Sequence, residues 1–158
     1  MPAKPGEAVK RRPAAYVVDS FALIAWLRDE PGADTVQSLL EKAKQNVIQI
    51  YASWINIAEV YYVTRRRSMN PDPGLTADKV LEVIENLPIE IEPVSKTEAV
   101  AAGRLKAEYP ISLADAFAGA VAKAYNAEVV TGDPEFRSLD QKKEIRVLWL
   151  PNKSQKNA

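Results

Sequence analysis

Residues 111–136, ISLADAFAGAVAKAYNAEVVTGDPEF, contain a complete helix–strand unit. Ser112, followed three residues later by Asp115, is a helix start signal, and Asn126 is a residue type that often ends a helix. The β-branched run at residues 128–131 predicts a strand, which the polar turn TGDP follows. A helix that leads directly into a short apolar strand is typical of an α/β fold.

The same alternation extends outward across the chain. Four more β-branched runs predict strands, at residues 16–19, 47–51, 89–94 and 145–149. Further helix start signals lie between the strands, at Ser20, Asp34, Ser53, Thr76 and, with Glu98, Ser95. Strands joined through helices require crossover connections, so we expect an α/β/α sandwich around a mainly parallel sheet of about five strands.

The composition indicates one globular domain. The chain has 158 residues, of which 47% are hydrophobic and 27% are charged, as is ordinary for a folded protein. No apolar run approaches the ~20 residues of a membrane span and no signal peptide is visible, so we expect a cytoplasmic protein without membrane contact. We expect a basic, proline-containing tail over residues 1–13, one domain over residues 14–150 and a polar tail over residues 151–158.

Two absent residue types narrow the possible chemistry. The sequence contains no Cys and no His, which excludes disulfides, thiol nucleophiles, Cys-ligated zinc and imidazole bases. Catalysis would have to use carboxylates, hydroxyls, Lys or Arg. The 21 basic and 21 acidic residues balance, so the net charge indicates neither a nucleic-acid binder nor a membrane-surface protein. The glycines form neither a GxGxxG nor a Walker A motif.

Four carboxylates occupy positions that favour a shared site. Asp19 ends a predicted strand, Asp133 follows another, and Asp115 lies in the first turn of a predicted helix. The carboxyl ends of parallel strands form the usual ligand crevice of such sheets. Glu59 interrupts an otherwise uncharged helical stretch, so we expect a buried carboxylate that needs a compensating partner. The alternatives are a helix cap for Asp19, a first-turn acid for Asp115 and a turn residue for Asp133.

Carboxylates that converge repel one another, and this repulsion raises their pKa values unless a cation neutralises them. All-oxygen ligands select hard divalent ions, so we expect Mg²⁺, with Mn²⁺ as a substitute. Such an ion activates water and holds phosphate oxygens during displacement at phosphorus. The pattern therefore favours phosphodiester hydrolysis in a chain that lacks His.

Three segments in this order resemble a known family: YVVDSFALIAWL (residues 16–27), SWINIAEVYYV (residues 53–63) and the stretch at residues 111–136. They resemble the PIN-domain family, in particular the VapC-type toxin ribonucleases of toxin–antitoxin pairs. The resemblance spans nearly the whole predicted domain and implies a PIN-like sandwich.

The resemblance also implies roles for individual residues. The acidic quartet of the family, which binds the metal and acts in catalysis, falls on Asp19, Glu59, Asp115 and Asp133. A hydroxyl residue two positions before the last acid is matched by Thr131, which would orient a water on the metal or the neighbouring carboxylates. Thr131 is alternatively only a strand residue.

The implied function is that of a metal-dependent endoribonuclease, held inactive by a cognate antitoxin and working as a homodimer. Two alternatives remain: a standalone PIN-type RNA-processing nuclease, and a non-catalytic PIN-like subunit that binds RNA or protein. An aspartyl-nucleophile phosphatase would usually need a second Asp two residues after Asp19, where Phe21 stands.

Basic and aromatic residues could contact RNA. Arg65, Arg66 and Arg67 end the predicted helix of Glu59, where they either complement the helix dipole or bind phosphate beside the acids. Four aromatic residues could stack on bases, although their spacing favours core or interface packing: Tyr51, Trp54, Tyr61 and Tyr62. The basic tail at residues 4–12 is assigned no role.

Overall fold

The computed structural model describes residues 12–67 and 75–152. Its strands are β1 (Ala14–Val18), β2 (Ile48–Ser53), β3 (Glu90–Glu92), β4 (Glu128–Thr131) and β5 (Arg146–Trp149). They form one sheet in the order β3-β2-β1-β4-β5, and each of its pairings is parallel. The predicted α/β fold with a mainly parallel sheet of about five strands is confirmed.

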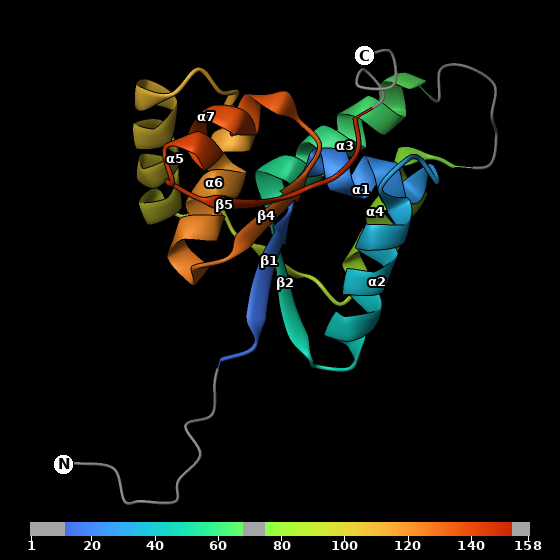
Figure 1. Cartoon of the computed structure of the whole chain (residues 1–158). Coiled ribbons are helices and arrows are strands. Elements are labelled where there is room, and N and C mark those ends of the chain that lie inside the picture. Colours follow the sequence, from blue (N-terminus) through green and yellow to red (C-terminus); the bar gives the residue numbers. More distant parts are fainter. Residues whose placement is uncertain (1–11, 68–74, 153–158) are drawn as a thin grey trace, which may run out of the picture.

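Helices cover both faces of this sheet (Figure 1). They are α1 (Ser20–Leu27), α2 (Ala33–Lys44), α3 (Trp54–Arg67), α4 (Ala77–Glu85), α5 (Lys96–Glu108), α6 (Leu113–Tyr125) and α7 (Arg137–Gln141), with a 3₁₀ turn, η1 (Pro134–Phe136), before α7. One apolar core lies between the sheet and α1, α2, α3 and α4, and a second lies between the sheet and α5 and α6. The result is the expected three-layer sandwich.

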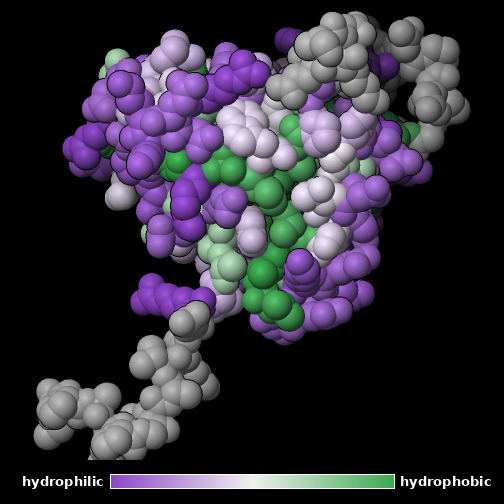
Figure 2. Space-filling view, viewed as in Figure 1, coloured by the Kyte–Doolittle hydropathy of each residue, from purple (hydrophilic) through white to green (hydrophobic). Residues whose placement is uncertain are grey.

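The strand alternation divides the apolar residues between the two cores. Val17 belongs to the α5–α6 core and Val18 to the opposite core, and Val129 and Val130 divide in the same way. All four are fully buried, as the central strands of a parallel sheet require. Figure 2 shows hydrophobic residues along the sheet between two layers with mainly hydrophilic outer surfaces.

Several predicted helix starts are correct, while those at Ser20 and Asp34 are displaced. Thr76, Ser95 and Ser112 each cap a helix through a side-chain oxygen that accepts a backbone N–H bond. Ser20 is instead the first residue of α1, which Asp19 caps. The start predicted at Asp34 is wrong, because α2 begins at Ala33 after a glycine with φ of 99° and no side-chain cap.

Two further boundaries have simple causes. The strand predicted to reach residue 94 ends at Glu92, because Pro93 has no N–H to continue the ladder. The short elements η1 and α7 were not predicted, since three and five residues are too few to show helical periodicity. They are nevertheless anchored, because Phe136 and Leu139 are fully buried.

Most of the two predicted tails, residues 1–11 and 153–158, lies outside the residues that the structure describes. Asn152, placed in the C-terminal tail, donates from Nδ2 to the carbonyl of Gly132 at 3.0 Å. None of the helices in residues 12–67 and 75–152 combines the length and apolarity needed to cross a membrane.

Candidate active site

Two neighbouring strands and one helix bring acidic residues to the same end of the sheet. Asp19 follows β1 and Asp133 follows β4, and these two strands pair directly. Asp115 lies in the first turn of α6, which packs against both strands. The site therefore forms at the carboxyl ends of the strands, where open α/β sheets bind their ligands.

Asp19 is held in place by both of its carboxylate oxygens. Oδ1 accepts from the backbone N–H of Ala22 at 2.9 Å, and Oδ2 accepts from the hydroxyl of Thr131 at 2.5 Å. The residue is 1% exposed. Burial raises the pKa of Asp19 to about 7, although both hydrogen bonds oppose the shift and the charges of Asp133 and Glu59 add to it.

Asp115 combines deep burial with an unpaired oxygen. Its backbone N–H donates to the Ser112 hydroxyl at 3.1 Å, the residue is 3% exposed, and Oδ2 is buried without a hydrogen-bond partner. Burial raises the pKa of Asp115 to about 9, and the hydrogen bond with Glu135 and the charges of Asp133 and Asp19 raise it further. A buried carboxyl oxygen without a partner is costly, so this position favours a ligand.

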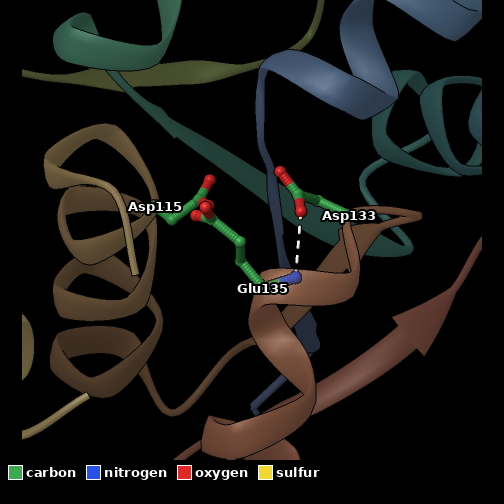
Figure 3. Close-up of side chains that lie close together, drawn as sticks. All are labelled: Asp115, Asp133 and Glu135. Carbon is green, nitrogen blue, oxygen red and sulfur yellow. Dashed lines mark hydrogen bonds between the residues drawn. The ribbon is translucent and has the colours of Figure 1, made fainter. Parts of the chain in front are cut away.

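Asp115, Asp133 and Glu135 converge (Figure 3). One carboxylate oxygen from each lies within 4.8 Å of the other two, the separation expected of oxygens that could share one ion. The Glu135 backbone N–H donates to Asp133 Oδ1 at 2.9 Å, and the Ser112 N–H donates to Glu135 Oε2 at 2.9 Å. We call Asp19, Asp115, Asp133 and Glu135 the acidic cluster.

Glu59 lies beside this cluster and differs from its prediction. The side chain is half-buried, where a buried one was expected. Its compensating partner is the buried Ser20 hydroxyl, which donates to Oε1 at 2.5 Å. The charge of Glu59 acts on Asp19, but Glu59 and Asp19 are not among the three residues whose oxygens converge.

Thr131 links the two strands of the site. Its buried hydroxyl donates to Asp19 and accepts from the backbone N–H of Asp133 at 3.0 Å. Of the roles considered from the sequence, the structure therefore supports orientation of a carboxylate. Its part in catalysis stays a prediction, as do the metal-binding and catalytic roles of the quartet.

Two residues of the site were missed. Glu135 follows Asp133 by two residues, and this short acidic spacing was the available signal. Asn56 is fully buried and donates from Nδ2 to the carbonyl of Ala114 at 3.1 Å, which ties α3 to the first turn of α6. A polar residue on the apolar face of a predicted helix was the signal for Asn56.

The aromatic residues considered for RNA contact mostly pack within the protein. Tyr51 is buried and stacks on Tyr125, with ring centroids 3.9 Å apart, and the Tyr61 hydroxyl donates to Asp78 at 2.8 Å. The Arg66 guanidinium lies 4.8 Å from the centroid of the Tyr62 ring. Arg65, Arg66 and Arg67 are exposed at the end of α3, a position that complements the helix dipole.

The acidic cluster fits a hard divalent cation. It offers only carboxylate oxygens, which such ions prefer, and one of its buried oxygens, Oδ2 of Asp115, has no hydrogen-bond partner in the protein. A cation would also relieve the repulsion that raises the pKa of Asp115 and Asp19.

A model of the PIN domain matches residues 16–142. The chain belongs to the PIN domain family. This PIN domain finds no significant match among curated protein sequences.

Solved structures share its fold. VapBC2 from Rickettsia felis, bound to a fragment of promoter DNA, matches with 21% identity and a TM-score of 0.65 over 87% of this chain and 99% of that chain. VapBC-5 from Mycobacterium tuberculosis matches with 21% identity and a TM-score of 0.60 over 87% and 99%. VapC20 from M. tuberculosis, a toxin that cleaves the sarcin–ricin loop, matches with 17% identity and a TM-score of 0.58 over 78% and 93%.

Proposed function

We propose that this PIN domain is a metal-dependent endoribonuclease that hydrolyses RNA phosphodiester bonds. The observation that carries the proposal is the convergence of carboxylate oxygens from Asp115, Asp133 and Glu135, in a chain without His or Cys. Oδ2 of Asp115, which is buried without a hydrogen-bond partner, supports it. Mg²⁺, or Mn²⁺ in its place, is the ion that this oxygen-only set would hold. Asp19 and Glu59 complete the set proposed as ligands and catalytic residues.

A bound divalent ion would supply activation of water and stabilisation of charge on the phosphate. Hydroxyl residues of the chain hold the carboxylates in fixed positions. Thr131 holds the Asp19 carboxylate by donating to Oδ2 and fixes the start of the Asp133 turn. Ser112 fixes two acids at once, because its hydroxyl accepts from the Asp115 N–H and its own N–H donates to Glu135. Ser20 orients Glu59.

We further propose that the chain is the toxin of a toxin–antitoxin pair, acting in the cytoplasm, as a homodimer and under control of a cognate antitoxin. Support comes from the similar folds of the VapBC complexes from R. felis and M. tuberculosis and of the toxin VapC20. An antitoxin that inserts an Arg or Lys among the carboxylates would compete with the metal for the same negative charge.

The test is cleavage of a mixed-sequence single-stranded RNA by the purified chain with Mn²⁺, with Mg²⁺ and with chelator. We expect cleavage that the chelator abolishes, and its loss in Asp19→Asn, which keeps the shape of the side chain but removes its charge. Near-normal cleavage by Asp19→Asn in a preparation free of contaminating nuclease would contradict the proposed site. Induced expression without a partner should arrest growth of the native host; unaffected growth would favour the standalone nuclease.

A further inference from the structure

A hollow lies near the acidic cluster, at the edge of the sheet. It has a volume of about 350 Å³ and is lined by Arg137, Asp140 and Gln141 of α7 and by Trp149 and Leu150 at the end of β5. Trp149 is 39% exposed, and Arg137 and Gln141 are exposed as well. β5 is an edge strand, beside which α7 lies (Figure 1).

The indole of Trp149 is fixed in orientation. Its Nε1–H donates to Asp140 Oδ2 at 3.0 Å, which satisfies the only polar atom of the ring. An exposed tryptophan at a strand edge adds to the risk of aggregation unless it has a binding role. A ring that is held from one side while it remains exposed is suited to stack with another planar group.

The neighbouring polar groups complement a nucleotide. The Arg137 guanidinium makes no hydrogen bond or ion pair with any other residue that the structure describes, so its charge is available to a phosphate. The amide of Gln141 offers both a donor and an acceptor to the edge of a base. An aromatic face, a free cation and an amide are the groups by which proteins bind single-stranded RNA.

Strands β4 and β5 and the turn η1 place the hollow close to the acidic cluster. Trp149 pairs in register with Thr131, whose hydroxyl bonds to Asp19. Asp133 is two residues beyond Thr131, so its Cα lies within about 12 Å of that of Trp149, given strand spacings of ~4.8 Å and at most ~3.6 Å per residue. Arg137 directly follows η1, which contains Glu135.

We infer that this hollow is a nucleobase subsite for single-stranded RNA, in which a base stacks on Trp149, Arg137 contacts the adjacent phosphate and Gln141 contacts the base edge. The inference rests on the proposed function, because RNA is the polymer that the acidic cluster would cut. It adds a second contact point for the RNA, outside the acidic cluster, and this contact would determine which phosphodiester bond lies at the acidic cluster.

The first experiment measures RNA binding without cleavage. A 5′-fluorescein-labelled RNA hexamer is titrated with the protein in chelator, and anisotropy gives Kd. Trp149→Ala should weaken binding about 5- to 150-fold, the range for loss of one base–aromatic stack. Arg137→Ala should lower the slope of log Kd against log salt by about one, as expected for one phosphate contact. Lys142→Ala, which removes a charge beyond the other end of α7, should leave both quantities unchanged.

A second measurement remains informative if the Trp149→Ala variant fails to fold. The chain has three tryptophans, and Trp54 matches Trp149 in exposure, at 37% against 39%. The hexamer should quench emission of the wild type and of Trp54→Phe, but not that of Trp149→Phe. Quenching that disappears in Trp54→Phe instead would overturn the subsite.

The outcomes separate this inference from the proposed function. Hexamer binding that depends on Trp149, without any metal-dependent cleavage, would leave the subsite standing and overturn the nuclease. Metal-dependent cleavage with Trp149→Ala binding the hexamer within twofold of wild type would overturn the subsite alone. Failure of the wild type to bind the hexamer, or an effect of Trp149→Ala only on binding of a protein partner, would also overturn the subsite.

Discussion

Two regions of the molecule gather carboxylates, and they differ in what the carboxylates face. The first is the acidic cluster. The second comprises Glu90, Glu92 and Glu98 of β3 and α5, which we call the β3 carboxylates. Each region contains one buried oxygen without a hydrogen-bond partner, Asp115 Oδ2 in the first and Glu98 Oε2 in the second.

In the second region the carboxylates lie beside tyrosines. Glu92 is 9% exposed and forms a hydrogen bond with the Tyr125 hydroxyl, which raises the pKa of Tyr125 to about 12, with burial as the next cause. Tyr125 stacks on Tyr51. The β3 carboxylates do not converge, whereas Asp115, Asp133 and Glu135 do. An unpaired oxygen therefore marks a candidate metal site only where other carboxylates point at the same space.

The largest contrast is expected in catalysis. Asp115→Asn should reduce metal-dependent RNA cleavage by at least about a hundredfold, since it removes the charge of a proposed ligand, and even supporting residues of metal sites cost about 10- to 100-fold. Glu92→Gln, an equally conservative change at a buried acid of the other region, should leave kcat/KM within about twofold of wild type. Equal losses in both variants would show that the rate follows stability rather than the acidic cluster.

Metal binding should separate the regions by a smaller amount. At a Mn²⁺ concentration of about 100 Kd the folded state gains about 2.7 kcal/mol, which corresponds to a rise in Tm of roughly 5–10 °C for a domain of this size. Glu135→Gln should lose more than half of this rise, whereas Glu98→Gln should retain it. Differential scanning fluorimetry at neutral pH gives the comparison, and an undiminished rise in Glu135→Gln would remove Glu135 from the metal site.

A third contrast concerns the pH dependence of stability without metal. Asp19 and Asp115 have pKa values raised to about 7 and about 9, against ~3.9 when unfolded, so between these values the folded state holds protons that the unfolded state has lost. The free energy of unfolding therefore falls as pH rises, by about 2 kcal/mol between pH 5.5 and 8.5 from Asp19 alone. Urea unfolding at the two pH values measures this loss.

Two controls define the pH window of that experiment. Asp19→Asn should reduce the loss, while Tyr125→Phe should not, because a raised tyrosine pKa affects stability only above its unfolded value of ~10. The lowered pKa of Glu135 stabilises the fold above ~4.3 and this contribution is lost only in stronger acid, outside the window. Stability that is constant or rises with pH would contradict the burial of Asp19 and Asp115.

Much of the fold follows from local patterns. The β-branched runs placed all five strands, and the hydroxyl caps at Thr76, Ser95 and Ser112 were correct because a side-chain cap is a local interaction. The start of α2 was wrong because Gly32 sets it through a positive φ, which composition alone does not reveal.

The site was predictable where strand order alone decides it. Asp19 and Asp133 follow adjacent strands, so their proximity follows from the topology. The cause of the raised pKa values was assigned to repulsion, but burial is the larger cause for Asp19, Asp115 and Asp133. Glu135 was missed because only the unpredicted turn η1 directs it back towards Asp115. Such contacts depend on tertiary geometry, which the sequence pattern does not contain.

The hydrogen bond between Thr131 and Asp19 joins residues 112 positions apart, and this separation has a consequence for synthesis. At about 5–20 residues per second, the ribosome needs roughly 6–23 s to proceed from Asp19 to Glu135. During this interval β1 can pair only with β2, and its other edge is an open apolar strand that invites aggregation. A growing chain therefore has to protect that edge before it can assemble the acidic cluster, which no fragment that stops before β4 can form.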